Sequence, residues 1–241
     1  MPTKWYHGTV IRIKTETSNT KRFWVEVPEV DSFAFEAGQF VTMDLPVHEK
    51  RLHRWRSYSL ANAPEGGNVL EFCIVKLEGG LASRYFFEEV KEGTTLKFKG
   101  PDGTFTLPKD LNGKMVWVCT GTGVAPFRSM LKDIHNRKLP FRHIHLIFGT
   151  RYEDGILYRD EFEAMQKEWP NFQYDIALSR VPDWEGYKGY VHQIYQAQYA
   201  KPDPDTHFYL CGWSNMIDDA VANLIVKMGY DKSQIHYELY G

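Results

Sequence analysis

The chain has 241 residues, of which 43% are hydrophobic and 25% are charged, and this balance excludes an intrinsically disordered protein. Its 29 Lys and Arg are offset by 31 Asp and Glu, so it lacks the basic excess typical of a nucleic-acid-binding protein. Its three cysteines are too few for a disulfide framework and show neither zinc nor iron–sulfur spacing, so no metal is expected. No segment has the apolar length of a membrane span or the apolar core of a signal peptide, which indicates a soluble, cytoplasmic protein.

Residues 1–110 are predicted to form an antiparallel β-barrel or sandwich. Apolar and polar residues alternate over short segments, as in half-buried strands, and glycine, proline or asparagine separates most of them. The segment Leu81–Val90 differs, because its apolar residues recur at helical spacing and predict a short helix. The predicted strands are Thr9–Lys14, Phe23–Val27, Gln39–Met43, Arg56–Leu60, Val69–Val75 and Thr95–Phe98.

Beyond a linker at Thr106–Lys114, strands and helices alternate, which predicts a doubly wound parallel sheet over residues 111–241. The strands of this half read as continuous apolar runs, as expected when both faces of a sheet are covered. The predicted strands are Met115–Cys119, His143–Phe148, Tyr174–Leu178, Thr206–Cys211 and Gln234–Tyr240, and the predicted helices are Pro126–Asn136, Asp160–Glu168, Gln193–Ala200 and Met216–Met228.

A glycine-rich turn, Gly121–Pro126, follows the first predicted strand of this half. Such a turn from strand to helix lets backbone N–H groups approach a pyrophosphate closely. The run is not a complete dinucleotide fingerprint, because Pro126 stands where the third glycine would be, and it lacks a P-loop lysine. Taken alone, it is equally consistent with a tight turn before a helix.

Two further motifs lie in the first half. Arg56–Ser59 reads Arg-Ser-Tyr-Ser, and a strand that bends at its end could aim these side chains at a flat ligand bearing a phosphate. An edge strand with a solvated arginine and a packed tyrosine fits the same residues. Gly79–Ser83 precedes the predicted short helix and offers free N–H groups to an anion, although a plain helix cap would look the same.

Taken together and in order, these motifs resemble the ferredoxin–NADP reductase superfamily over nearly the whole chain. The ordered set is Arg56–Ser59, Gly79–Ser83, Gly100–Gly103, Gly121–Pro126, Cys211–Gly212, Met216–Ile217 and Glu238–Tyr240. The resemblance implies a two-domain flavoenzyme, with a FAD-binding barrel over residues 1–110 and an NAD(P)-binding α/β domain over residues 111–241.

On the flavin side, the resemblance implies that Arg56 holds a flavin phosphate, Tyr58 packs on the isoalloxazine ring and Ser59 hydrogen-bonds near its N5 atom. The Gly79–Ser83 segment supplies N–H groups and the Ser83 hydroxyl to the pyrophosphate. The terminal aromatic residue, Tyr240, is expected to stack over the flavin, although Gly241 follows it here. The other expected cofactor-binding residues on this side are Ser57, Ile74, Lys76, Gly80, Leu81 and Ala82.

On the nucleotide side, the turn containing Thr122, Gly123 and Pro126 is expected to bind the nicotinamide dinucleotide, with Cys211 beside the nicotinamide ring and Gly212 next to it. Hydride transfer needs the donor carbon and the flavin N5 atom within about 3–3.5 Å of each other. The flavin supplies the chemistry, and the protein positions and tunes it. The residues expected around the reacting atoms, and counted as catalytic, are Ser59, Cys211, Glu238 and Tyr240.

Preference for NADPH over NADH is expected from basic and hydroxyl residues after two strands. Arg151 follows the strand His143–Phe148, and Ser179-Arg180 follows Tyr174–Leu178, with Lys188 eight residues later. No acidic residue stands directly at either strand end, where an NAD site commonly carries one for the ribose. The alternative is that these cations are solvated loop charges that pair with nearby acids, and NADH remains a possible substrate.

The electron acceptor is expected to be a separate ferredoxin or flavodoxin, because the chain has no C-x4-C-x2-C cluster motif of its own. A basic cluster, Lys50–Arg56, could steer an acidic carrier or could be a solvated loop. The enzymatic alternatives are a reductase component of an oxygenase and a reductase of free flavin. The non-enzymatic alternative is a flavin-binding redox module, which would not need the Gly121–Pro126 turn or Cys211-Gly212.

Overall fold

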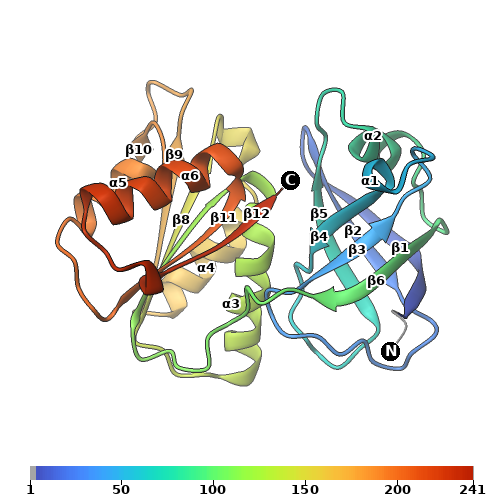
Figure 1. Ribbon diagram of the computed structural model, residues 1–241, viewed down its shortest axis with the longest axis horizontal. Coiled ribbons are helices and arrows are strands. Elements are labelled where there is room, and N and C mark those ends of the chain that lie inside the picture. The colour runs from blue at the N-terminus through green and yellow to red at the C-terminus, as the bar shows by residue number, and fades with distance from the viewer. Residues whose placement is uncertain (1–3, 241) are drawn as a thin grey trace. The chain divides into compact units, whose positions relative to one another are not determined.

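The structure is a computed structural model that describes residues 4–240, with all of their side chains except that of Tyr240. The chain divides into two compact units, whose elements are labelled in Figure 1. The barrel unit comprises the described residues up to Leu107 together with Ala125–Lys138. The parallel-sheet unit comprises Pro108–Val124 and the residues from Leu139 onward.

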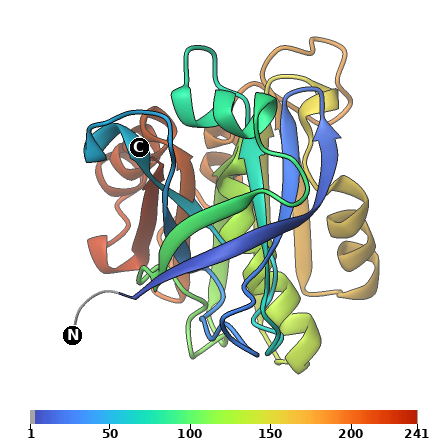
Figure 2. The same cartoon turned by 90° about the vertical axis from the view of Figure 1, so that its right-hand side faces the viewer.

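The barrel unit is built on a six-stranded antiparallel sheet with the order β4-β3-β6-β1-β2-β5. The two edge strands meet, because the Ala61 N–H just beyond β4 donates to the Glu71 carbonyl of β5 at 2.8 Å, and the sheet thereby closes into a barrel. Figure 2 shows β1 running beside β6 along this barrel. The strands are β1 (Trp5–Thr17), β2 (Thr20–Glu26), β3 (Phe40–Asp44), β4 (Trp55–Ser59), β5 (Val69–Val75) and β6 (Thr95–Asp102). The prediction of an antiparallel barrel is confirmed.

Aromatic side chains fill the barrel and hold the helix α2 (Leu81–Glu88) against it. Phe86 of α2 is fully buried and packs edge-on against Phe23 of β2, with ring centroids 5.2 Å apart. Burial of such rings is the main source of stability in a small barrel. The helix α3 (Ala125–Arg137) also belongs to this unit, where Phe127 packs against Phe105 at 5.6 Å.

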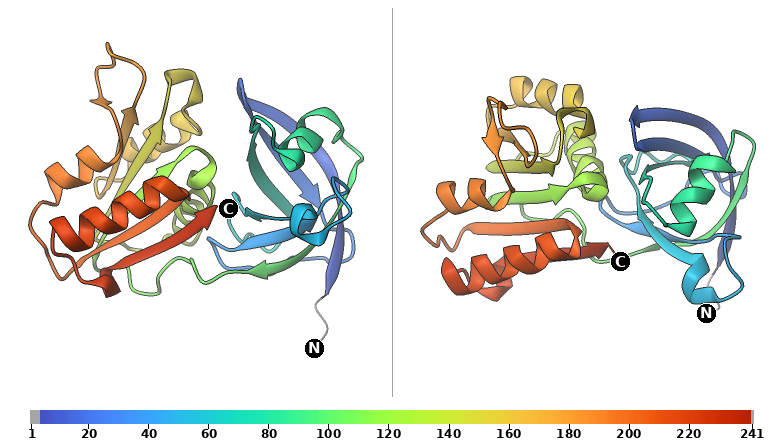
Figure 3. Two further views of the ribbon diagram at one scale, coloured as in Figure 1. Left: turned by 45° about the horizontal axis from the view of Figure 1, so that its top comes forward. Right: turned by 90° about the horizontal axis from the view of Figure 1, so that it is seen from above.

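The parallel-sheet unit has six parallel strands in the order β10-β9-β8-β7-β11-β12. Helix α4 lies on one face of the sheet, and α5 and α6 lie on the other (Figure 3). The strands are β7 (Lys114–Thr120), β8 (His143–Thr150), β9 (Phe172–Leu178), β10 (Tyr187–Lys188), β11 (Thr206–Trp213) and β12 (Ile235–Tyr240), and the helices are α4 (Arg159–Glu168), α5 (His192–Gln198) and α6 (Ser214–Ala222). The predicted doubly wound parallel sheet is confirmed.

The structure differs from the sequence-based expectation in short elements. The basic cluster is not a plain loop, because Arg51–Arg54 forms the one-turn helix α1. A 3₁₀ turn, Gly121–Val124, precedes α3, so Pro126 is its second residue rather than its first. The helix predicted up to Met228 instead changes at Asn223 into a π-helical turn. Among residues 4–240, no helix has the length and apolar character needed to cross a membrane.

Candidate functional site

Strand β4 presents the residues of the Arg-Ser-Tyr-Ser motif at different depths. Ser59 is buried, Arg56 and Tyr58 are half-buried, and Ser57 is exposed with its hydroxyl 3.3 Å from that of Thr42. The Tyr58 ring packs edge-on against Phe86 of α2, with centroids 5.4 Å apart. Strand β4 and helix α2, which carry two separate sequence motifs, are therefore neighbours in the barrel unit.

The Tyr58 hydroxyl stays neutral at every physiological pH. Burial raises its pKa well above the ordinary value, and the nearby Arg56 guanidinium opposes this only in part. A neutral phenol keeps its proton and can donate a hydrogen bond to a ligand.

Arg56 is held in position by backbone carbonyl groups. Its Nη1 atom donates to the Leu52 carbonyl at 2.9 Å and to the Trp55 carbonyl at 2.7 Å, which ties α1 to β4. Within the described residues no carboxylate pairs with Arg56. Its charge is therefore fixed in place without being neutralised, which suits a phosphate ligand.

A cavity of about 290 Å³ lies beside the glycine pair at the start of α2. Its lining residues are Lys76, Leu77, Glu78, Gly79, Gly80, Arg84 and Glu88. Lys76 Nζ lies 3.6 Å from Glu88 Oε1, whereas no carboxylate in the described part of the chain pairs with Arg84. Arg84 was missed by the sequence reasoning, and its position directly after Ser83 in the motif was the available signal.

Ser83 lies inside the turn and does not face the cavity with a free hydroxyl. Its Oγ atom accepts from the Leu77 N–H at 3.0 Å and lies 3.1 Å from the Gly80 carbonyl oxygen, to which it donates. Gly80 is the N-cap residue of α2, and a Cβ there would come within 2.7 Å of Ser83 Oγ. In this structure Ser83 shapes the loop whose backbone lines the cavity.

The other expected flavin-side residues differ in what they can offer. Ile74 is 3% exposed, and its side chain belongs to the hydrophobic core of the barrel. Ala82 is buried and Leu81 is half-buried, so the first turn of α2 can present their N–H groups but little side chain. The cavity places Lys76 and Arg84 beside the carboxylates of Glu78 and Glu88, so its fit to the pyrophosphate of FAD rests on the glycine turn, the N–H groups of the helix N-terminus and the Arg84 guanidinium.

In the parallel-sheet unit, the glycine turn after β7 packs directly on the end of β11. A Cβ at Gly123 would overlap the Cys211 carbonyl oxygen, and a Cβ at Gly212 would overlap Thr120 Oγ1. Gly212 also has a φ of +149°, which favours glycine. Motifs about 90 residues apart in the sequence therefore meet at the carboxyl edge of the sheet, where doubly wound folds bind nucleotides.

Two of the four residues expected around the nicotinamide, Cys211 and Glu238, lie in one row of this sheet. Cys211 is opposite Cys119 on one side and Glu238 on the other. Cys211 is fully buried, whereas Glu238 and Thr122 are half-buried. The Tyr240 side chain lies outside the described part of the structure, and Ser59 belongs to the barrel unit.

The cations expected to select NADPH gather at the same edge. The Arg180 N–H donates to the Arg151 carbonyl at 3.0 Å, and Lys188 is paired with Leu178 at the end of β9. Ser179 is half-buried, with its N–H bonded to the Thr150 carbonyl. Arg151, Arg180 and Lys188 are exposed, and none of them has an ion pair within residues 4–240. Glu153, which could have neutralised Arg151, pairs with Arg159 at 2.7 Å instead.

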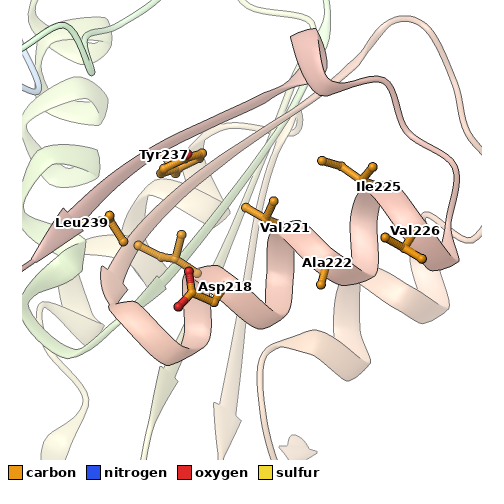
Figure 4. Close-up of a pocket in the computed structure, with 8 residues that line it drawn as sticks. Asp218, Val221, Ala222, Ile225, Val226, Tyr237 and Leu239 are labelled. Atoms are coloured by element: carbon orange, nitrogen blue, oxygen red, sulfur yellow. The ribbon is translucent and has the colours of Figure 1, made fainter.

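A second cavity, of about 310 Å³, lies between α6 and β12 and has a different character (Figure 4). It is lined by Val221, Ile225, Tyr237 and Leu239, with Asp218 as its charged residue. None of the expected cofactor-binding residues lines it. An apolar groove without cations does not suit a phosphate-bearing ligand.

Comparison with known proteins matches both halves of the chain to domain families. Residues 7–107 match the oxidoreductase FAD-binding domain, and residues 117–222 match the oxidoreductase NAD-binding domain. Ferredoxin–NADP reductase B of Sorangium cellulosum (strain So ce56) is 35% identical over 241 aligned positions, which cover 98% of this chain and 97% of that relative. The phenol hydroxylase P5 protein of Acinetobacter pittii is 29% identical over 98% of this chain, which spans 65% of that protein's length.

Solved structures agree with these matches. A ferredoxin NADP⁺ reductase from Neisseria gonorrhoeae with bound FAD and NADP has a TM-score of 0.82 at 27% identity, and 99% of each chain is covered. A cytochrome P450 reductase from Amycolatopsis has a TM-score of 0.88 at 26% identity, covering 99% of this chain and 70% of the other. The chain belongs to the ferredoxin–NADP reductase superfamily of flavin- and pyridine-nucleotide-dependent oxidoreductases.

Proposed function

We propose that this protein takes a hydride from NADPH onto a bound FAD and passes electrons singly to a separate carrier, a ferredoxin or a flavodoxin. The observation that carries the proposal is the packing of the Gly121–Val124 turn on Cys211-Gly212 at the carboxyl edge of the parallel sheet. A flavin-binding module without turnover has no need of this second site. The FAD-binding domain is proposed to cover residues 1–110 and the NAD(P)-binding domain residues 111–241, a division supported by the family matches at 7–107 and 117–222, although residues 125–138 group with the barrel unit.

FAD, when bound, supplies the change from two-electron to one-electron chemistry. The residues of this chain hold and orient it. Arg56, fixed by two backbone carbonyls, is proposed to bind a flavin phosphate, with Tyr58 against the ring and Ser59 near N5. The first turn of α2, with Lys76 and Arg84 beside it, is proposed to bind the pyrophosphate, which FMN lacks. These contacts would hold FAD firmly, and they therefore argue against the alternative in which flavin is a passing substrate.

NADPH is proposed as the preferred donor because Arg151, Arg180 and Lys188 lie at one sheet edge and none of them pairs with a carboxylate of residues 4–240. Three cations at one sheet edge suit the 2′-phosphate that distinguishes NADPH from NADH. Cys211 and Glu238 are proposed to contact the nicotinamide, since Cys211 adjoins the glycine turn and Glu238 lies opposite Cys211 on β12.

The carrier is proposed to be a separate protein, and a second candidate acceptor is an oxygenase component or a cytochrome. The names of two relatives, the phenol hydroxylase P5 protein and the Amycolatopsis cytochrome P450 reductase, point to acceptors of that kind, and both relatives extend beyond the part that this chain matches. A reducing, cytoplasmic location is also proposed, because Cys73, Cys119 and Cys211 are buried thiols that form no disulfide.

Three measurements test the proposal. Acid release of the cofactor should yield FAD, and a chromatogram with FMN alone would contradict the flavin assignment. Anaerobic mixing with NADPH should bleach the flavin faster than mixing with NADH at equal concentration. Cytochrome c reduction should then rise when a ferredoxin or flavodoxin is added; if an oxygenase component accelerates turnover and neither carrier does, the second candidate is correct.

A further inference from the structure

Helix α3 carries a buried ion pair that joins it to the barrel. Arg128 and Glu71 are each 4% exposed, and Arg128 Nη1 lies 2.9 Å from Glu71 Oε2. The same nitrogen donates to the Ala61 carbonyl at 2.7 Å. On its other side, Glu71 Oε1 accepts from Arg22 Nε at 2.6 Å. Glu71 therefore binds a guanidinium on β2 and another on α3 at the same time.

The segment that α3 touches is itself fixed to β5. The Ala61 N–H donates to the Glu71 carbonyl, and the Glu71 N–H donates to the Asn62 side-chain oxygen at 2.9 Å. Helix α3 adds two more polar contacts to this segment. Ser129 Oγ donates to the Asn62 carbonyl at 2.6 Å, and Asn136 donates to the Glu65 carboxylate at 3.0 Å.

Helix α3 also has an apolar face that packs against its surroundings. Phe127, Met130, Leu131 and Ile134 are all buried. A buried ion pair adds little net stability, because desolvation offsets most of the attraction between the charges. Directional polar contacts fix the helix at one rotation about its axis and at one position along that axis, because apolar contacts alone would allow it to slide. The charged pair is thus better explained by position than by stability.

The position of α3 matters because of what precedes it. Its first residue, Ala125, directly follows Val124, the last residue of the glycine turn proposed to bind the nucleotide. Arg128 lies in the first turn of the helix, four residues beyond that turn. The N–H groups at this helix end are the ones expected to face an anion.

We propose that the Arg128–Glu71 pair is a positioning device that locks the first turn of α3 to the barrel and thereby fixes the Gly121–Val124 turn for the nucleotide. This inference rests on the proposed function, because it assigns Arg128 and Glu71 a part in nucleotide use. Neither residue is assigned a contact with flavin or nucleotide. Both act through the helix.

The test compares the flavin-loaded wild type with Glu71→Gln, Arg128→Met and the double variant, which keeps the volume and removes both charges. In the double variant, flavin reduction by NADPH in a single turnover should slow about 10- to 100-fold, since small displacements of a reactant are that costly. Flavin content should be unchanged, and the dissociation constant for NADPH should change less than about threefold. The long-wavelength absorbance that a stacked nicotinamide–flavin pair gives on mixing should weaken as well.

The urea midpoint of each variant shows whether the Arg128–Glu71 pair positions α3 or only stabilises the fold. Glu71→Gln takes the carboxylate away from the buried Arg128 guanidinium and should lower the urea midpoint, whereas Arg128→Met leaves Glu71 paired with Arg22 and should lower it less. The double variant should recover most of the loss seen in Glu71→Gln. If the double variant recovered the rate of flavin reduction as well as the urea midpoint, and so reacted like the wild type, the proposal would be overturned. Arg137→Met is the matched control on the same helix, because Arg137 pairs with Asp133 within α3 at 2.9 Å, and it should leave the rate unchanged.

Amide exchange tests the anchoring without any turnover. In the double variant the amides of residues 121–131 should exchange faster than in the wild type, and in Arg137→Met they should not. Unchanged exchange would overturn the proposal. A wild-type protein that NADPH does not reduce would instead contradict the proposed function, while the exchange comparison would still decide whether the pair anchors α3.

Discussion

The two units hold their candidate ligand-binding cations in different ways. In the barrel unit, Arg56 donates to two backbone carbonyls and Lys76 lies near Glu88, whereas Arg84 has no ion pair within residues 4–240. At the carboxyl edge of the parallel sheet, Arg151, Arg180 and Lys188 are exposed and have no ion pair within the described residues. Arg56 is therefore held in place before a ligand arrives, whereas the three cations of the sheet edge must be ordered by the ligand.

This difference matches the length of time for which each proposed ligand is expected to stay bound. Ordering a flexible side chain on binding costs about 0.5–1.5 kcal/mol, so a site whose cation is already held in place retains its ligand more firmly. A site whose exposed cations the ligand must order binds more weakly and releases its ligand sooner. The barrel unit therefore suits a flavin that stays bound, and the sheet edge suits a nucleotide that must leave after each turnover.

The largest expected effect comes from Gly123→Ala in the glycine turn. The new Cβ would overlap the Cys211 carbonyl oxygen, so the backbone of the turn must shift. A shift of about 1 Å costs on the order of 100-fold in rate, and kcat/KM for NADPH should fall by about that factor. Flavin content should stay at the wild-type level.

Gly67→Ala is the control for this substitution, because nothing lies within 4 Å of a Cβ at that position. Its NADPH efficiency should equal that of the wild type. If Gly123→Ala also stayed within threefold of the wild type, the turn would not be part of the nucleotide site.

Arg180→Ala should reduce NADPH efficiency selectively. The loss of one charge-assisted hydrogen bond costs roughly 1.5–3 kcal/mol, which corresponds to about ten- to a hundredfold in kcat/KM. NADH lacks the 2′-phosphate, so its efficiency should barely change. Arg142→Ala is the control, since Arg142 precedes β8 at the opposite sheet edge and pairs with Asp205 at 2.9 Å. Equal losses with both nucleotides would show that Arg180 serves another purpose.

Arg56→Ala should weaken flavin retention by about tenfold, through loss of a charge-assisted contact to phosphate. The measurement is the dissociation constant of FAD from apoprotein, with NADPH binding followed separately. Arg54→Ala is the matched control, because Arg54 pairs with Asp44. Unchanged FAD affinity in Arg56→Ala would contradict the flavin assignment of the barrel unit.

The sequence predicted the long elements of both units because their hydrophobic periods are clear. It missed α1, since Arg51–Arg54 has four residues, no apolar stripe and no side-chain cap. It also missed β10, since two residues carry no period. Within the site, Arg84 was overlooked although it adjoins the predicted motif.

Tertiary pairing explains what the sequence could not reveal. The contact of Gly123 with Cys211 and the alignment of Cys211 with Glu238 depend on strand order, which single motifs do not encode. One sign of the Arg128–Glu71 pair is visible in the sequence, because Glu71 is a charged residue inside the apolar strand Val69–Val75. Nothing in the sequence identified Arg128 as its partner.

Lower pH should destabilise the parallel-sheet unit. Burial lowers the pKa of His143, His192 and His236 in the folded protein. The unfolded chain, with histidine pKa values near 6.5, therefore binds protons first as the pH falls. The free energy of unfolding should decrease from pH 7.5 to pH 5.5, as followed by urea titration. Replacing all three histidines with glutamine should flatten this dependence, and a slope identical to the wild type would contradict it.

The smallest expected effect is on the free energy of unfolding, and it concerns two buried tyrosine hydroxyls of the parallel-sheet unit, one with hydrogen-bond partners and one without a partner in the described residues. The Tyr174 hydroxyl is buried without a hydrogen-bond partner in the described residues, and its ring packs against Phe162 at 5.3 Å. Tyr230, in contrast, donates to the carbonyls of Tyr199 and Lys201 at 2.9 and 3.1 Å. Because an orphaned buried donor is itself unfavourable, Tyr174→Phe should leave the free energy of unfolding unchanged or raise it by up to about 1 kcal/mol. Tyr230→Phe should lower it by about 1 kcal/mol, since both carbonyls lose a donor. Urea unfolding of the two variants decides the point, and a Tyr174→Phe loss equal to that of Tyr230→Phe would reveal a partner for the Tyr174 hydroxyl.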